Sequence, residues 1–186
     1  MGTAGRTDVQ RKPIKLALQG GGAHGAFTWG VLDHILADGR LEITSVSGAS
    51  AGAMNAVVLA DGLADGGPDK ARAQLDRFWR KASLDGSLPD VARPVFDTIL
   101  SLWSVENNPW LSMLSHASPY DFNPLNINPL KAILEQEIDF ERLRNASPVR
   151  LAIAATNTET GKVRVFRECE LTADHIAASA CLPQVF

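Results

Sequence analysis

Two short apolar runs in the first third of the chain are each followed by small, glycine-containing residues and then by a helical pattern. Residues 14–18 and 41–46 have strand character. Residues 26–36 place apolar side chains at helical spacing, and residues 53–59 read as a second helix. The pattern therefore predicts two strand–turn–helix units whose strands lie side by side and parallel in one sheet.

The rest of the pattern predicts helices and one β-hairpin. The expected elements are helices over 69–82, over 93–103, from Pro129 (with Asn128 as N-cap) to about Glu137 and over 173–181 (with Thr172 as N-cap), and paired strands over 149–156 and 163–166. Residues 107–129 are rich in Asn and Pro and are expected to be irregular. Together these elements predict an α/β fold with a mainly parallel central sheet flanked by helices.

The segment Gly48-Ala49-Ser50-Ala51-Gly52 lies where the second strand passes into its helix. A serine on such a tight turn, with only small residues around it, is typical of a nucleophile elbow, which exposes Ser Oγ at the edge of the sheet. The helix dipole behind it favours developing negative charge. The alternative is a strand-to-helix turn in which Ser50 serves only as an N-cap.

The segment Gly20-Gly21-Gly22-Ala23-His24-Gly25 follows the first strand. Backbone amides in such a loop bind either a phosphate or the oxyanion of a tetrahedral intermediate. Its spacing also fits the G-x-G-x-x-G dinucleotide motif, with Glu42 as the ribose-binding acid. That acid belongs at the end of the second strand, however, and Glu42 opens it, so the pairing of loop and elbow favours acyl transfer.

Three segments of the chain resemble the motifs of the patatin-like phospholipases in the expected order. They are the glycine loop, the G-x-S-x-G elbow and residues 177–186, which match the family's A-S-x-x-x-P segment. The resemblance implies a three-layer fold over residues 13–186, after a polar tail of residues 1–12. It also implies a serine hydrolase that acts on lipid or other acyl esters through an acyl-enzyme and needs no metal or organic cofactor. In this assignment Ser50 is the nucleophile, Gly48 and Gly52 shape the elbow, and Gly20, Gly21, Gly22, Gly25 and Ala51 form the oxyanion and substrate-binding set.

The sequence departs from the family pattern at two points. His24 stands where the family often has arginine, and the implied Ser/Asp dyad uses no histidine, so His24 is read as a partly exposed loop residue. The family's D-G-G or D-G-A aspartate follows the third segment, and we expect it beyond Phe186, in a C-terminal portion that completes the fold. The literal match Asp65-Gly66-Gly67 lies in residues 61–68, whose Gly and Pro content predicts a turn.

Composition narrows the possible partners. The 186 residues carry a formal charge of −3, which gives no electrostatic case for nucleic-acid binding. Cys169 and Cys181 lack metal or redox spacing, and the chain shows neither a signal sequence nor an apolar span, so we expect reduced thiols and a cytoplasmic protein. The apolar residues of 96–103 and 110–114 favour buried packing, with a transient membrane-surface contact as the alternative.

Two other functions remain compatible with these motifs. An intracellular polyhydroxyalkanoate depolymerase would use the same chemistry at Ser50 on a different ester. A non-catalytic module would use the glycine loop to bind an anion or a nucleotide, and its affinity would not depend on Ser50. The sequence does not choose the lipid head group, acyl length, positional preference or oligomeric state.

Overall fold

The computed structural model describes residues 11–82 and 128–181. The first stretch contains strand β1 (Lys12–Leu18), the 3-10 turn η1 (Gly22–His24), helix α1 (Gly25–Asp38), strand β2 (Leu41–Gly48) and helices α2 (Ala51–Gly66) and α3 (Pro68–Ala82). The second contains helices α7 (Pro129–Glu137) and α8 (Phe140–Ala146), strands β3 (Arg150–Thr156) and β4 (Val163–Arg167), the 3-10 turn η2 (Glu168–Glu170) and helix α9 (Ala173–Ala180).

The four strands form one sheet in the order β1-β2-β3-β4. The β1/β2 and β2/β3 pairs are parallel, and β4 returns antiparallel to β3 as the predicted hairpin. The register aligns Leu16, Val46 and Leu151 on neighbouring strands, so these apolar side chains share one face of the sheet. The predicted α/β class with a mostly parallel sheet flanked by helices is confirmed.

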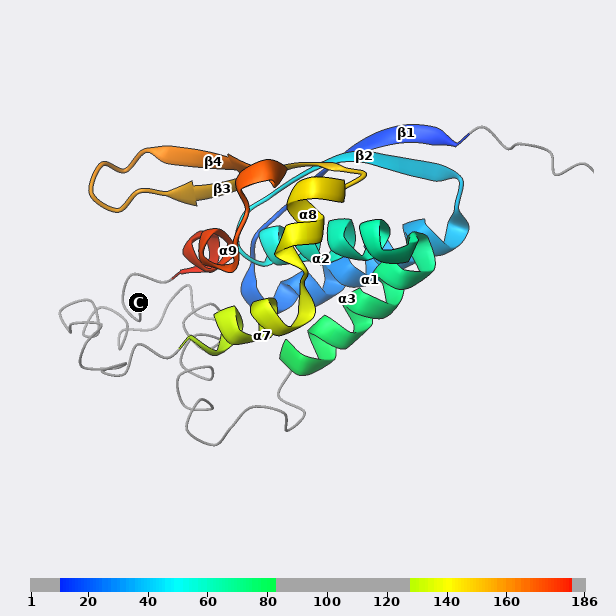
Figure 1. Cartoon of the computed structure of the whole chain (residues 1–186), viewed down its shortest axis with the longest axis horizontal. Coiled ribbons are helices and arrows are strands. Elements are labelled where there is room, and N and C mark those ends of the chain that lie inside the picture. The colour runs from blue at the N-terminus through cyan, green and yellow to red at the C-terminus, as the bar shows by residue number, and fades with distance from the viewer. Residues whose placement is uncertain (1–10, 83–127, 182–186) are drawn as a thin grey trace, which may run out of the picture.

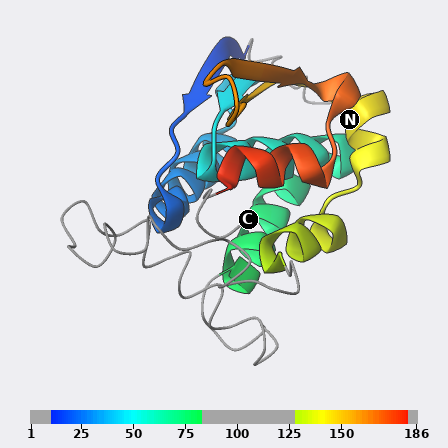
Figure 2. The same ribbon diagram turned by 90° about the vertical axis from the view of Figure 1, so that its left-hand side faces the viewer.

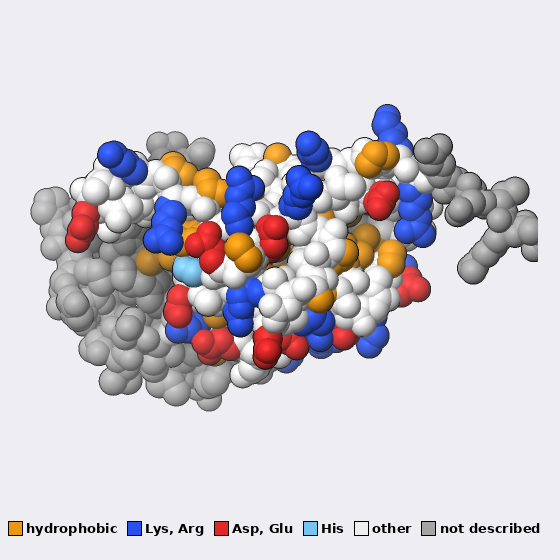
Figure 3. Space-filling model, turned by 45° about the horizontal axis from the view of Figure 1, so that its top comes forward, with side chains coloured by type: hydrophobic (Ala, Val, Ile, Leu, Met, Phe, Trp, Pro, Cys, Tyr) orange, Lys and Arg blue, Asp and Glu red, His pale blue; other side chains and the backbone are white. Residues whose placement is uncertain are grey.

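The helices α1, α2, α3, α7 and α9 lie on one face of this sheet (Figures 1 and 2). The described residues thus supply two of the three expected layers. The other face carries exposed side chains such as Lys15, Ser47 and Val165. Figure 3, which turns this side towards the viewer, shows Lys and Arg side chains spread over it among apolar ones.

Helix α2 is the centre of the core. Its residues from Ala51 to Gly62 are all buried, and it contacts β1, β2, β3 and helices α1, α3, α8 and α9. A helix that is apolar around most of its circumference needs neighbours on every side, which explains why the other elements gather around it. The elbow at its N-terminus is therefore anchored in the most buried part of the molecule.

The structure differs from the sequence predictions at three places. Residues 61–68 do not form a turn: α2 continues through Gly66, and only Gly67, at φ 81°, separates it from α3. Helix α8 was not predicted. The elbow itself is tighter than expected, because β2 extends to Gly48 and α2 already begins at Ala51.

Some expectations concern residues outside the described stretches. These are the polar tail apart from its last two residues, the helix over 93–103, the irregular region of 107–127 and the end of the third segment from Leu182. Among the described helices, none is long and apolar enough to cross a membrane.

Candidate active site

Ser50 lies between the end of β2 and the start of α2, in a strained backbone conformation. Its dihedral angles are φ 55° and ψ −125°, and in the described stretches no other residue except glycine has a positive φ. An L-residue adopts such angles at a cost of about 1–3 kcal/mol, and structures retain them mainly where the surroundings enforce them. A strained serine between a strand and a helix is typical of a nucleophile elbow.

The two elbow glycines permit close backbone contacts that any side chain would block. A Cβ on Gly48 would lie 2.5 Å from the carbonyl oxygen of Gly52, and a Cβ on Gly52 would lie 2.2 Å from that of Leu18. Real Cβ atoms do not approach other atoms this closely. Gly52 therefore lets the first turn of α2 pack directly on the end of β1.

The glycine loop lies beside the elbow. A Cβ on Gly20 would be 3.1 Å from both Ser50 Cβ and the carbonyl oxygen of Ala49. Gly21 (φ 147°) and Gly22 (φ 55°) occupy conformations that favour glycine, and Gly21 is exposed whereas Gly22 is buried. The structure thus brings the two predicted glycine segments together at the carboxyl ends of β1 and β2.

Gly25 occupies a different environment. It is the buried first residue of α1, and a Cβ there would lie 2.5 Å from the Trp79 ring and 2.8 Å from Ala51 Cβ. Its carbonyl accepts a 3.0 Å hydrogen bond from Asn55 Nδ2, and Asn55 Oδ1 accepts one of 2.8 Å from Trp79 Nε1. Gly25 therefore joins the glycine loop to α2 and α3 through close packing and this buried hydrogen-bond chain.

His24 is exposed at the start of α1. Its Nδ1 lies 3.0 Å from the carbonyl oxygen of Gly21, and since a carbonyl only accepts, Nδ1 donates in this bond. The imidazole thus braces its own loop.

Ser179 connects the third segment to the elbow, a contact that the sequence did not predict. The Ser50 backbone N–H donates to Ser179 Oγ at 2.9 Å, and Ser179 Oγ donates to the carbonyl oxygen of Ala154 at 2.6 Å. Ser179 lies on α9, which begins at the predicted N-cap Thr172 and runs beneath the sheet beside α2 (Figure 2). In the sequence, the only indication that Ser179 could belong to the site was its place in the third family motif.

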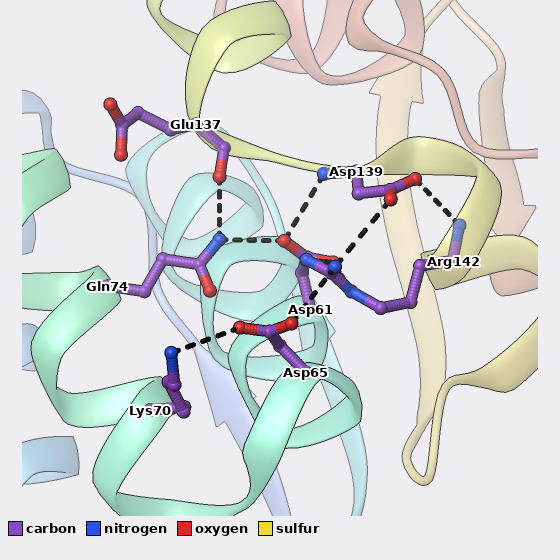
Figure 4. A network of polar contacts seen from close by, with 7 residues as sticks. All are labelled: Asp61, Asp65, Lys70, Gln74, Glu137, Asp139 and Arg142. Carbon is purple, nitrogen blue, oxygen red and sulfur yellow. Dashed lines mark hydrogen bonds and ion pairs between the residues drawn. The ribbon is translucent and has the colours of Figure 1, made fainter.

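Asp65 is engaged in ion pairs away from the elbow. Its carboxylate lies 3.2 Å from Arg142 Nη1 and 3.7 Å from Lys70 Nζ, as Figure 4 shows. Within residues 11–82 and 128–181, no carboxylate or imidazole hydrogen-bonds to the Ser50 hydroxyl. These contacts agree with a structural interpretation of Asp65.

The described residues offer no obvious alternative chemistry. No group of three or more His, Cys, Asp or Glu side chains in this part of the chain is arranged to hold a metal ion. Burial raises the pKa of the half-buried Cys181 thiol, which disfavours the reactive thiolate at neutral pH.

Comparison with known proteins places the chain in a family. Residues 16–186 match the family profile described as patatin-like phospholipase. The chain belongs to this family. No curated protein gives a significant sequence match.

Two solved structures show similarity at low sequence identity. VipD from Legionella pneumophila is 20% identical with a TM-score of 0.42, over 87% of this chain and 40% of VipD. In the ExoU–SpcU complex of the Pseudomonas aeruginosa type III secretion system, the matched chain is 22% identical with a TM-score of 0.45, over 91% of this chain and 36% of its own length. This patatin-like chain thus spans well under half the length of both.

Proposed function

We propose that the protein is a serine lipid acyl hydrolase in which Ser50 is the nucleophile. The observation that carries the proposal is the strained Ser50 backbone at the edge of the sheet, directly beside the glycine loop. Membership of the patatin-like phospholipase family supports ester hydrolysis and a lipid substrate.

In this mechanism Ser50 Oγ attacks the acyl carbonyl carbon and loses its proton to a carboxylate base. The backbone amides of Gly21 and Gly22 stabilise the oxyanion, together with the Ala51 N–H, which as the first amide of α2 has no intrahelical acceptor. The alcohol leaves with a proton, and water then releases the acid from the acyl-enzyme. The base that we propose is the family's D-G-G or D-G-A aspartate, which follows the third segment in the family's motif order.

The proposal also includes the partners and the location expected from the sequence. The substrate is a lipid or another acyl ester, met through transient contact with a membrane surface, and the enzyme acts in the cytoplasm. No nucleic acid, metal or organic cofactor takes part. Hydrolysis of polyhydroxyalkanoate and non-catalytic anion binding are the competing functions.

Fatty-acid release from phosphatidylcholine vesicles by the full-length protein tests the proposal. We expect release by the wild type, none above background by Ser50→Ala, and wild-type release by Ser47→Ala. Ser47 is a suitable control because it is an exposed serine near the end of β2, the strand that precedes Ser50.

Three results would contradict the proposal. Equal release by wild type and Ser50→Ala would exclude Ser50 as the nucleophile. Hydrolysis of 3-hydroxybutyrate oligomers without any release from vesicles would favour the depolymerase. Nucleotide or phosphate binding that Ser50→Ala leaves unchanged, with no hydrolysis of either ester, would favour the binding module.

A further inference from the structure

The backbone N–H of Ser50 has a partner that comes from the far end of the described chain. Ser179 Oγ lies 2.9 Å from this nitrogen, although the two residues are 129 positions apart. An N–H can only donate and a carbonyl can only accept, so the orientation of the Ser179 hydroxyl is fixed. Its one hydrogen points to the Ala154 carbonyl at 2.6 Å, and its lone pairs face Ser50.

The two elements that anchor this hydroxyl, β3 and α9, lie outside the elbow segment 48–52. Ala154 lies in β3, a strand buried at Leu151 and Ile153. Helix α9 presents Ala173, Ile176, Ala177 and Ala180 to the core and packs on β3. The Ser179 hydroxyl is thus held between α9 and β3, and it reaches Ser50, whose backbone is strained.

This bond also distinguishes the two backbone amides at the elbow, those of Ser50 and Ala51. The Ser50 N–H is already occupied, whereas the Ala51 N–H, next along the chain, starts helix α2. With its own N–H held by Ser179, Ser50 keeps the peptide orientation that presents Oγ and leaves the following amide for an oxyanion.

We propose that Ser179 is a positioning residue for the nucleophile: its hydroxyl fixes the strained backbone of Ser50 by bridging it to β3. This inference rests on the proposed function, because it assigns Ser179 a part in reactivity. A small displacement of a reacting group lowers rates by up to about 10²-fold. Loss of the bridge should therefore slow the covalent step at Ser50 without weakening ligand binding.

The variants are chosen as matched pairs. Ser179→Thr keeps the hydroxyl, and Ser179→Val has the same shape without it. Ser147→Ala serves as the control, because Ser147 Oγ makes the same two kinds of bond, donating to the Val149 carbonyl at 2.7 Å and accepting from the Val149 N–H at 3.3 Å. Ser147 precedes β3, at the end opposite to Ala154.

The first readout is the rate at which a fluorophosphonate probe labels the full-length protein. At saturating probe, we expect Ser179→Val to react on the order of 10- to 100-fold more slowly than wild type. The probe concentration that gives half of the maximal labelling rate should be unchanged. Ser179→Thr and Ser147→Ala should stay within a few-fold of wild type. Equal saturating rates for Ser179→Thr and Ser179→Val would overturn the proposal.

The second readout is hydrogen exchange at the Ser50 amide, which does not depend on catalysis. Exchange should be faster in Ser179→Val than in Ser179→Thr, and unchanged in Ser147→Ala. If wild type fails to react with the probe, the proposed function fails, and exchange alone decides the bridge. Equal Ser50 exchange in the Thr and Val variants would then overturn it, whereas faster exchange confined to the elbow in Ser179→Val would support it.

Discussion

At the scale of single residues, the candidate site depends on positions where the smallest side chain is required. Gly52 is the clearest case, because its Cα faces the carbonyl oxygen of Leu18 at the end of β1. Contact between α2 and β1 at this point brings the elbow and the glycine loop together. The chemistry that we propose for Ser50 therefore relies on a neighbour that takes no part in the reaction.

Substitution of Gly52 by alanine tests this contact. The added Cβ would lie 2.2 Å from the Leu18 oxygen, so the backbone must shift, and overpacking of this kind costs about 1–3 kcal/mol. Gly30→Ala is the control, because nothing lies within 4 Å of a Cβ at that helix position, where alanine is the better helix former. Urea denaturation should show a less stable Gly52→Ala and a Gly30→Ala at least as stable as wild type; equal stabilities would contradict the packing argument.

At the scale of elements, local patterns predicted the four strands and most described helices, but not the effects of tertiary contact. The Gly and Pro content of residues 61–68 suggested a turn, yet a Cβ on Gly62 would lie 2.4 Å from Ala71 Cα. Gly62 thus permits α2 and α3 to pack closely while the helix continues. Helix α8 escaped prediction because its seven residues are too few to show periodicity, although Asp139 caps it through the Arg142 N–H.

The residues of the candidate site likewise divide into those that a local pattern predicts and those that only tertiary contacts bring together. Ser50 and the glycine loop were predictable because each lies in a short local motif whose spacing is its signal. The bond from Ser50 to Ser179 joins residues 129 positions apart, and no local sequence pattern predicts it. The buried bonds from Asn55 to Gly25 and Trp79 likewise depend on how three helices meet.

The Asn55 bonds give a prediction about how these helices are joined. Asn55 is fully buried, and Asn55→Ala would leave the Trp79 Nε1–H without its acceptor and remove one donor from the Gly25 carbonyl. An unsatisfied buried group costs about 1–3 kcal/mol, so we expect a loss of about 1–3 kcal/mol in the free energy of unfolding. A double-mutant cycle with Trp79→Phe should give a coupling of about 1 kcal/mol, whereas purely additive effects would contradict a direct bond.

At the scale of the whole molecule, a polar network joins the two described stretches of the chain (Figure 4). Asp61, fully buried on α2, accepts hydrogen bonds from Gln74 Nε2 on α3, Arg142 Nε on α8 and the Asp139 N–H. Gln74 Nε2 also donates to the carbonyl oxygen of Glu137 at 2.6 Å. Charges this deep are tolerated only when they are paired, so the network favours one arrangement of α3, α7 and α8 around α2.

The Glu137 side chain makes the stability of the fold depend on pH. This side chain is 4% exposed, and its carboxylate accepts hydrogen bonds from Arg77 and Lys81. Burial alone raises the pKa of this carboxyl, but the hydrogen bonds and charges of Lys81 and Arg77 outweigh burial and hold the pKa below its ordinary value of 4.5. A lowered folded-state pKa means that the interaction stabilises the protein above the unfolded pKa and is lost as pH falls through the folded pKa.

Glu137→Gln should therefore be less stable than wild type at pH 7, by about 1 kcal/mol, because partial exposure of both cations screens the pair. The difference should shrink as pH falls below 4.5, towards and through the lower folded-state pKa. Denaturation curves at several pH values measure it, with Glu135→Gln, a more exposed position on the same helix, as the control. A stability difference that does not change with pH would contradict the assignment.

Mass spectrometry of the fluorophosphonate adduct tests the central claim, that Ser50 is a nucleophile in a patatin-like site, most directly. The full-length protein is treated with the probe and digested, and the modified residue is located by peptide fragmentation. The account predicts a single adduct on Ser50 that is absent from Ser50→Ala and retained in Ser47→Ala. An adduct on another residue, or equal labelling of wild type and Ser50→Ala, would contradict it.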